Sequence, residues 1–256
     1  MTRAATVLVV ACVALAGAAD GAADGRRTGF DDLSPATQAM QRDDAQNPGM
    51  LWVAEGEALW KRKDGTRDLS CASCHGDAAA AMRGVAARYP AFDPTLGHPV
   101  DLGQRIEQCR RERQGAPPRS TESAELVALE TYVAHQSRGL PIAPPSDPRL
   151  APFVDRGRTL WRQRIGQLDL ACAQCHDDNP GRRVGGSVIP QGHPTGYPIY
   201  RLEWQSAGTL QRRLRACMSG VRAEPYPYGA PELVDLEAYL AQRAAGLAID
   251  TPAVRP

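Results

Sequence analysis

The sequence predicts an all-α protein built from two consecutive copies of one helical domain. Several short segments recur at a spacing of 101 residues or slightly more, which indicates an internal duplication. Apolar residues recur at helical spacing in both copies, and no two segments show the period-two alternation of paired strands. The 256 residues are 43% hydrophobic and 23% charged, which is ordinary for a folded soluble chain and excludes wholesale disorder or an integral membrane body.

Charge and aromatic content narrow the function classes. The formal net charge is +1 and the isoelectric point about 7.6, so no bulk positive charge favours a nucleic acid partner. Lys61 and Lys63 are the only lysines, so nearly all of the 30 basic residues are arginines. With three Phe, seven Tyr and four Trp, the chain is poor in aromatic side chains. Its core therefore relies on aliphatic residues or on an apolar group that the chain binds.

Residues 1–19 have the pattern of a secretory signal peptide. One basic residue precedes an apolar run over residues 4–15, and the small residues 16–18 fit a cleavage site, with cleavage expected between residues 18 and 24. A membrane anchor would need about 18 or more apolar residues. Residues 9–12 resemble a lipoprotein acylation box, but they lie very early in the chain. We therefore expect a mature protein exported to a bacterial periplasm, where free thiols tend to be oxidised or bound to a ligand.

Four of the remaining six cysteines form two Cys-x-x-Cys-His motifs, at residues 71–75 and 172–176. This motif attaches c-type haem: two thiols one helical turn apart add to the two vinyl groups of one porphyrin, and the adjacent histidine becomes an axial ligand. A zinc site or a redox dithiol is the alternative, but the 101-residue separation, the histidines and export disfavour both. We expect two covalently bound haem c groups, whose porphyrins also supply apolar surface to the core. The attaching cysteines are Cys71, Cys74, Cys172 and Cys175, and the histidine ligands are His75 and His176.

The internal repeat extends well beyond the two haem motifs. Segments before and after each motif match, at an offset of 101 residues up to the motif and of 107 or 108 after it, apart from the Gly-His-Pro segments at 95. The increase in this offset indicates insertions between the haem motif and the later cysteine of the second copy. The matched pairs are 56–60 with 157–161, 69–71 with 170–172, 97–99 (Gly-His-Pro) with 192–194 (Gly-His-Pro), 105–109 with 213–217, and 125–130 with 232–237.

The duplication divides the mature chain into two domains. We expect an N-terminal domain over residues 25–140 and a C-terminal catalytic domain over residues 153–256. Five prolines between residues 141 and 152 disfavour helix and strand and predict a stiff linker. A helix before each haem motif and another near the end of each domain match the plan of class I cytochrome c. These helices are expected at residues 51–62, 122–137, 153–164 and 231–245, the last with Pro231 in its first turn.

The second axial ligand of each iron has three interpretations. Methionine is usual in such domains, but Met82 follows His75 by only seven residues, and Met218 is the sole candidate in the second copy. His98 and His193, each within a Gly-His-Pro segment, could serve as ligands or could pack beside the haem as loop residues.

The third interpretation assigns Cys109 and Cys217 as ligands, and we favour it. A disulfide between them is the ordinary expectation in an oxidising compartment. Each, however, occupies the same place in its own copy, so each most simply serves its own domain. As thiolates bound to ferric iron, both would be protected from oxidation. A thiolate ligand also lowers the reduction potential, which disfavours a general electron shuttle.

A distinctive run, Arg-Arg-Leu-Arg-Ala-Cys-Met-Ser-Gly-Val-Arg-Ala-Glu-Pro, surrounds Cys217 at residues 212–225. Upstream lie residues 189–198 (Ile-Pro-Gln-Gly-His-Pro-Thr-Gly-Tyr-Pro) and residues 200–205 (Tyr-Arg-Leu-Glu-Trp-Gln). With the two haem motifs and their paired cysteines, these segments resemble the SoxA family, the dihaem subunits of the SoxAX cytochromes of sulfur-oxidising bacteria. The resemblance covers essentially the whole mature chain.

The resemblance implies an enzyme, an L-cysteine S-thiosulfotransferase that joins thiosulfate to a cysteine of a SoxYZ-like sulfur carrier. Two electrons pass to a cytochrome c acceptor, and a SoxX-like monohaem cytochrome c completes a heterodimer. The resemblance also implies that Cys217 is both an axial ligand and the reactive sulfur, found as a persulfide in the family. By the same resemblance, Cys71, Cys74, His75 and Cys109 hold the N-terminal haem, and Cys172, Cys175, His176 and Cys217 hold the C-terminal haem.

Arginines near Cys217 are the candidate substrate-binding residues. Thiosulfate is a dianion, and the planar donor group of arginine suits its sulfonate oxygens. Arg213 precedes Cys217 by four residues and would share its helix face, whereas Arg215 would point away. The resemblance adds Arg243, in the last helix, as a weaker candidate.

Two other functions remain as alternatives. A tetrathionate-forming thiosulfate dehydrogenase can also carry a His/Cys-ligated haem, and it would turn over with thiosulfate alone. A passive periplasmic electron-transfer cytochrome would show no thiosulfate-dependent reduction.

Overall fold

The computed structural model describes residues 25–256, so the predicted signal peptide lies outside the described residues. The α-helices are α1 (Pro35–Arg42), α2 (Met50–Lys61), α3 (Cys71–His75), α4 (Ala78–Ala81), α5 (Leu102–Cys109), α6 (Ala124–His135), α7 (Ala151–Arg162), α8 (Cys172–His176), α9 (Leu210–Gly220) and α10 (Pro231–Arg243). The strands are β1 (Ala91–Asp93), β2 (His98–Val100), β3 (Arg183–Val184), β4 (Ser187–Val188), β5 (Ile199–Arg201), β6 (Ser206–Gly208) and β7 (Ala253–Arg255). Short 3₁₀ or π segments are η1 (Ala86–Arg88), η2 (Arg110–Gln114) and η3 (Pro148–Leu150).

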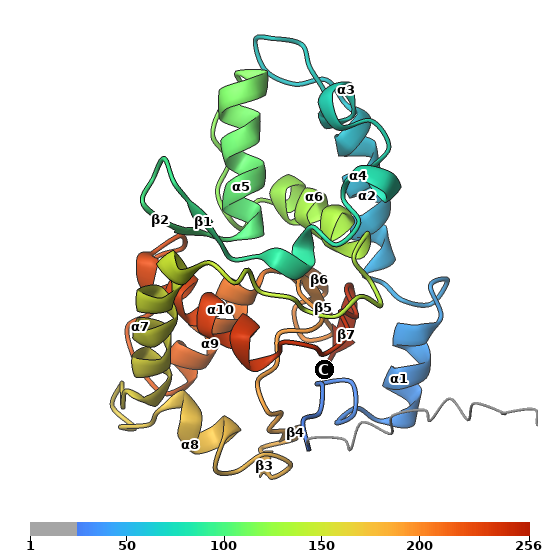
Figure 1. Ribbon diagram of the computed structural model, residues 1–256. Coiled ribbons are helices and arrows are strands. Elements are labelled where there is room, and N and C mark those ends of the chain that lie inside the picture. The colour runs from blue at the N-terminus through green and yellow to red at the C-terminus, as the bar shows by residue number, and fades with distance from the viewer. Residues whose placement is uncertain (1–24) are drawn as a thin grey trace, which may run out of the picture.

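The described chain is mainly helical and forms two stacked halves (Figure 1). One half contains α2 to α6, and the other contains α7 to α10. The four helices expected from the sequence are α2, α6, α7 and α10, and each is confirmed with ends within two residues of the expected ones. Across residues 25–256, no helix is long and apolar enough to cross a bilayer.

In each half, the helix before the haem motif crosses the last helix at a glycine. α2 packs on α6, and α7 packs on α10. A Cβ atom on Gly56 would overlap the carbonyl oxygen of Ala128, and one on Gly157 would overlap that of Asp235. The helix backbones therefore touch at these points, which only glycine permits. The repeated segments that begin with these glycines mark the same helix crossing in both copies.

Each crossing places a tryptophan in the core of its half. Trp60 is 4% exposed and lies 6.1 Å from the ring of Tyr132. Trp161 is 2% exposed and lies 6.1 Å from the ring of Tyr239. The two ring pairs are inclined at 59° and 57°, so the cores of the two halves repeat each other closely.

Short strand pairs are present, and the expectation that none would form was wrong. β1 pairs antiparallel with β2, and β5 pairs antiparallel with β6 and parallel with β7. β3 and β4 form a separate antiparallel pair. Each strand has only two or three residues, which is too short for an alternating pattern to be visible in the sequence.

The strands also correct one part of the sequence alignment. A cis Tyr-Pro peptide precedes the strand pair in both halves, at Tyr89–Pro90 and at Tyr197–Pro198, which are 108 residues apart. Residues 97–99 (Gly-His-Pro) follow the first of these peptides and enter β2, whereas residues 192–194 precede the second. The pairing of the two Gly-His-Pro segments was therefore wrong, because a chance match of three residues was taken as structural equivalence.

The insertion expected in the second copy is confirmed. Between His176 and Tyr197 the second half carries the β3–β4 pair, and the corresponding stretch of the first half, between His75 and Tyr89, contains no strand. Residues of this pair border the cavity that contains Cys217.

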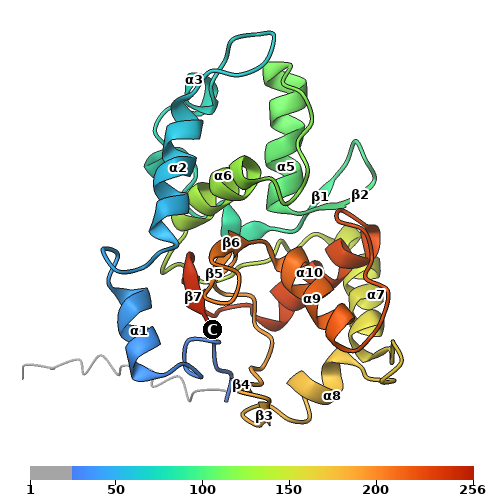
Figure 2. The same ribbon diagram turned by 180° about the vertical axis from the view of Figure 1, so that it is seen from behind.

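Both ends of the described chain pack on the second half (Figure 2). α1 contacts β7 through Gln41, which is 4% exposed. The Gln41 amide donates to the carboxylate of Asp250 at 2.9 Å, and its oxygen accepts from the backbone N–H of Val254 at 3.0 Å. Residues that precede the first haem motif thus brace the half that contains the second. The expected domain boundaries at residues 140 and 153 stay a prediction.

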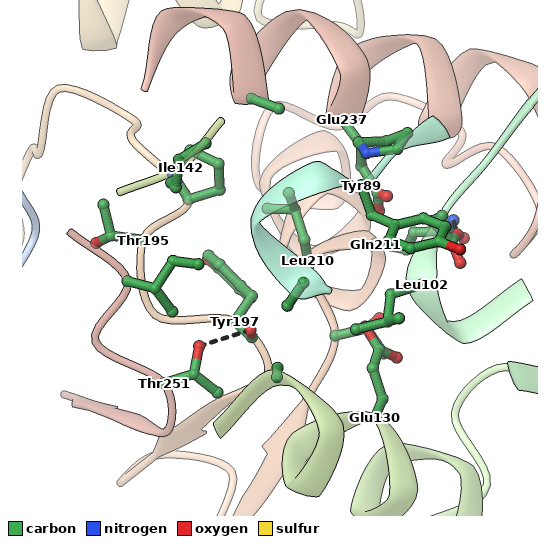
Figure 3. A pocket seen from close by; sticks show the side chains of 18 of the residues that line it. Tyr89, Leu102, Glu130, Ile142, Thr195, Tyr197, Leu210, Gln211, Glu237 and Thr251 are labelled. Carbon is green, nitrogen blue, oxygen red and sulfur yellow. Dashed lines mark hydrogen bonds between the residues drawn. The ribbon is translucent and has the colours of Figure 1, made fainter. Parts of the chain in front are cut away.

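A cavity of about 100 Å³ with a mixed polar and apolar lining lies between the halves (Figure 3). Three side chains that we call the central carboxyls line it: Asp101 at the start of α5, Glu130 on α6 and Glu237 on α10. The amide of Gln211 donates to Asp101 at 2.7 Å. Burial raises the pKa of Asp101 to about 6, and burial followed by repulsion from neighbouring carboxylates raises the pKa values of Glu130 and Glu237 well above the usual range. The cluster therefore keeps protons in the folded protein at pH values where free carboxyls are ionised.

Candidate functional site

The second haem motif forms α8 directly after a tight turn. Ile165 and Leu170 pair through their backbones, and Gly166 between them has a φ of +70°. A Cβ atom on Gly166 would lie 2.7 Å from the backbone nitrogen of Ala223, so glycine lets the turn pack against the chain that follows α9. This contact holds α8 beside the helix that carries Cys217.

His176, the expected histidine ligand, is fixed by two contacts. Its Nδ1 donates to the carbonyl oxygen of Pro190 at 2.7 Å, which leaves Nε2 free to bind iron. Its ring lies 5.4 Å from the ring of Trp161. Burial lowers the pKa of His176 and so favours the neutral imidazole, the form that binds a metal.

Cys217 lies on α9 and borders the same cavity as His176. The cavity has a volume of about 360 Å³, and Trp161 and Leu214 contribute to its apolar walls. Burial, followed by the proximity of Cys217, raises the pKa of Cys172 to about 11, so the two sulfur atoms are near neighbours. His176 and Cys217 border one cavity, Cys172 lies beside Cys217, and this donor set fits a His/Cys-ligated haem.

The first copy repeats this arrangement with a more exposed histidine. The ring of His75 lies 5.7 Å from Trp60. Burial, followed by the proximity of Cys109, raises the pKa of Cys71. Cys109 is the last residue of α5, and its effect on Cys71 places it beside the first haem motif. His75 is exposed and His176 is half-buried, so the second site is the more enclosed of the two.

The two spare cysteines, Cys109 and Cys217, are free thiols, so the disulfide interpretation is wrong. Each lies with the haem motif of its own copy, as the duplication predicts. The reason is the fold itself, because each cysteine is held on the helix that follows the strand pair of its own half.

The other ligand candidates have separate positions. His98 lines a cavity that includes neither His75 nor Cys109, which disfavours it as an iron ligand. Met82 packs against the core of the first half, and Met218 is 5% exposed in the core of the second. His193 borders the Cys217 cavity and donates through Nδ1 to a backbone carbonyl at 2.7 Å.

The two candidate substrate-binding arginines have different surroundings. Arg213 lies one helical turn before Cys217 on α9 and lines the same cavity, as the sequence predicts. Arg243 lies at the end of α10, donates to the carboxylate of Asp177 at 2.7 Å and stacks 4.9 Å from the ring of Trp161. Arg213 is therefore positioned to contact an anion at Cys217, whereas Arg243 already has an anionic partner.

Two residues of this cavity escaped the sequence analysis. Tyr197 and Arg201 line it together with Cys217. Burial raises the pKa of Tyr197, so its phenol stays protonated. Extending the 108-residue offset of the pair 105–109 and 213–217 back to these residues would have placed them opposite Tyr89 and Asp93 and drawn attention to them.

Comparisons with known proteins place the chain in a family. The profile described as SoxA/TsdA, cytochrome c domain, matches residues 55–142 and 156–249, and a cytochrome c domain carries haem c. The chain is 39% identical over 220 residues to the L-cysteine S-thiosulfotransferase subunit SoxA of Pseudaminobacter salicylatoxidans, covering 86% of this chain and 77% of the relative. It is 35% identical over 229 residues to the subunit of the same name from Rhodovulum sulfidophilum, covering 90% and 80%. The crystal structure of SoxXA from P. pantotrophus matches with a TM-score of 0.87 at 31% identity, over 90% of this chain and 87% of that chain. The chain therefore belongs to the SoxA/TsdA family of cytochrome c domains and, within it, to the SoxA proteins.

Proposed function

We propose that the chain is the thiosulfate-conjugating subunit of a periplasmic cytochrome complex, an L-cysteine S-thiosulfotransferase. It would join thiosulfate to a cysteine of a SoxYZ-like sulfur carrier and pass two electrons to a cytochrome c. The observation that carries the proposal is the placement of Cys217, His176 and Arg213 around one cavity. The names of the relatives, which are L-cysteine S-thiosulfotransferase subunits, support the activity.

The proposal includes two tandem cytochrome c-like domains with one haem c each. His176 and Cys217 would bind the C-terminal iron, with Cys172 and Cys175 attaching the porphyrin. When bound, this haem supplies a one-electron acceptor next to the reacting sulfur. The repeated geometry supports the same roles in the first copy, where Cys71 and Cys74 would attach the haem and His75 and Cys109 would bind its iron.

Arg213 would hold thiosulfate with its outer sulfur toward Cys217. Its guanidinium group is free to donate to the sulfonate oxygens, because within the described part of the chain Arg213 forms no ion pair. The new bond joins the outer sulfur of thiosulfate to the sulfur of the carrier cysteine. One thiol proton and two electrons leave, and the product keeps the remaining single negative charge. Cys217 would be the reactive sulfur at which both reactants meet.

A SoxX-like monohaem cytochrome c is the proposed partner. The solved structure that matches this chain is titled SoxXA, and the match covers nearly the whole of both chains, which supports a similar heterodimer. The pattern of a signal peptide at residues 1–19 supports a periplasmic location.

Replacing Cys217 tests the proposal. In the complex with the SoxX-like partner, reduction of cytochrome c should require both thiosulfate and the carrier, and C217A should abolish it. Ser219→Ala is the matched control, because Ser219 is an exposed residue two positions further along α9 that does not border the cavity. Turnover that survives in C217A would contradict the role of Cys217.

Tetrathionate formation by a thiosulfate dehydrogenase is the second candidate. The matching family profile supports it, because the profile covers TsdA, a family name for such dehydrogenases, as well as SoxA. A tetrathionate-forming enzyme would reduce cytochrome c with thiosulfate alone. Omitting the carrier from the same assay therefore separates the two activities, and a passive cytochrome would show neither.

A further inference from the structure

Because the chain is duplicated, the residues of the Cys217 cavity can be compared with their equivalents in the first copy. Aligned on the Tyr-Pro peptides, the two halves repeat at an offset of 108 residues, and the strand pairs have the same register. Asp93 pairs with His98 at the end of β1, and Arg201 pairs with Ser206 at the end of β5. The equivalent pairs around the two sites are Tyr89 with Tyr197, Asp93 with Arg201, Arg105 with Arg213, and Cys109 with Cys217. Among these four pairs, one charged position differs: the first copy has Asp93 where the second has Arg201.

In the first copy the charge of the arginine is neutralised. Arg105 forms an ion pair of 2.9 Å with Asp93, whose side chain is 2% exposed. Asp93 is also fixed by the backbone N–H groups of Thr95 and Leu96, which donate at 2.8 and 3.1 Å. In the first site Arg105 is therefore held in a balanced ion pair and is not available to bind an anion.

In the second copy the two equivalent residues are both cations. Arg201 is 7% exposed, and within residues 25–256 its buried Nε has no hydrogen-bond partner. Its ion pair is with Glu203 at 3.1 Å, and that side chain is 53% exposed, so solvent screens the pair. Arg213 forms no ion pair in the described residues, and both arginines line the cavity of Cys217. Arg201 and Arg213 therefore lie at the cavity without a buried carboxylate partner, because Asp32, which also lines it, is ion-paired with Arg27.

Haem binding does not account for this difference. Both copies contain the same haem attachment motif and an equivalent cysteine, so an arginine needed to bind haem would be needed in both copies. The extra cation serves something that only the second site binds. Burying unpaired charge is costly unless an opposite charge joins it, and a small dianion supplies that charge.

We propose that Arg201 is a second substrate-binding residue, which acts with Arg213 to hold the sulfonate group of thiosulfate and restricts thiosulfate binding to the C-terminal site. This inference rests on the proposed function for the identity of the anion. Two guanidinium groups on different elements, β5 and α9, can bind different oxygens of one sulfonate group. The residue at the third position of the strand, Asp93 in β1 or Arg201 in β5, then determines which of two similar sites accepts an oxyanion.

Equilibrium binding of thiosulfate to the holo complex, with no carrier present, tests the proposal by titration calorimetry. Removing one charge-assisted contact typically weakens binding by about 10- to 100-fold, and we expect this rise in Kd for R201Q. R201D, which restores the charge pattern of the first copy, should bind at least as weakly. Arg215→Gln is the matched control, because Arg215 lies on α9, stacks over Tyr228 and does not line the cavity. Its Kd should stay within about twofold of wild type.

A Kd for R201Q within twofold of wild type would overturn the proposal. So would an unchanged Kd accompanied by a shifted haem spectrum and midpoint potential, because Arg201 would then be serving a haem propionate. R201K keeps the charge and much of the packing but loses the planar donor fork, and we expect its Kd to rise by about fivefold. If R201Q does not fold, an unchanged Kd in R201K overturns the proposal in its place. Failure of the proposed function is a separate result: the wild-type complex would bind thiosulfate but transfer nothing to the carrier.

Discussion

Replacing Gly157 by alanine tests the backbone contact that positions the second haem motif. The added Cβ would lie 2.6 Å from the carbonyl carbon of Asp235 and 2.8 Å from the Cβ of Tyr239. Nonbonded carbon atoms need about 3.5 Å, so α7 would have to move away from α10 by about 1 Å. Trp161 lies one turn further along α7 and packs on both Tyr239 and His176, so the histidine ligand would be displaced with it.

The expected cost follows from the kind of atoms that clash. Overpacking a core costs about 1–3 kcal/mol, and the upper end applies here because the nearest atoms belong to the helix backbone rather than to a flexible side chain. The better helix propensity of alanine offsets about 1 kcal/mol. We therefore expect G157A to lower the free energy of unfolding by about 2 kcal/mol.

Denaturation of the holoprotein by guanidinium chloride, followed by circular dichroism and Soret absorbance, measures this loss. Gly220→Ala is the matched control: Gly220 is the last residue of α9, and a Cβ there would meet nothing within 4 Å. The control should change the free energy of unfolding by less than about 0.5 kcal/mol. If G157A is as stable as wild type and keeps its Soret band, the inferred backbone contact is refuted.

Two further predictions concern ionisable side chains. The central carboxyls hold protons in the folded protein that the unfolded chain releases. The free energy of unfolding therefore falls as pH rises from about 4 through 6 and above. The loss is about 1.4 kcal/mol for each unit by which folding raises a pKa. The double variant E130Q/E237Q should therefore be more stable than wild type at pH 8, and this advantage should vanish near pH 4. Denaturation midpoints measured between pH 4 and pH 8 check this prediction. A stability advantage that does not depend on pH would contradict it. R243Q should lower thermal stability by removing the ion pair with Asp177, and should raise the KM for thiosulfate less than R213Q does. An equal rise in KM would place Arg243 at the substrate.

The long helices could be predicted because each carries its pattern locally. The apolar spacing of α2 and α7 and the covalent chemistry of the two Cys-x-x-Cys-His motifs depend on residues close together in the sequence. The face shared by Arg213 and Cys217 follows in the same way, from a separation of four residues within one helix. The duplication then assigned Cys109 to the first motif, because equal positions in two copies imply equal surroundings.

What the sequence analysis missed depends on contacts between distant segments. The three-residue strands have no periodicity of their own and are fixed by the chain that packs around them. Gln41 reads as an ordinary polar helix residue, yet it joins the start of the described chain to its end. Glu130 and Glu237 resemble solvent-facing helix residues, but they belong to different halves and line one cavity only because the two halves stack. The proposed role of Arg201 depends on the cavity that it shares with Arg213 and on its equivalence to Asp93, so the sequence around Arg201 does not indicate it.

Mass spectrometry of the carrier tests the central claim most directly. The wild-type complex is incubated with the carrier, a cytochrome c acceptor and thiosulfate labelled at its outer sulfur, and the carrier is then recovered. The account predicts that the carrier cysteine gains one thiosulfate group containing the label, and that the carrier stays unmodified when the complex carries C217A. An unmodified carrier beside free labelled tetrathionate in the wild-type reaction would contradict it.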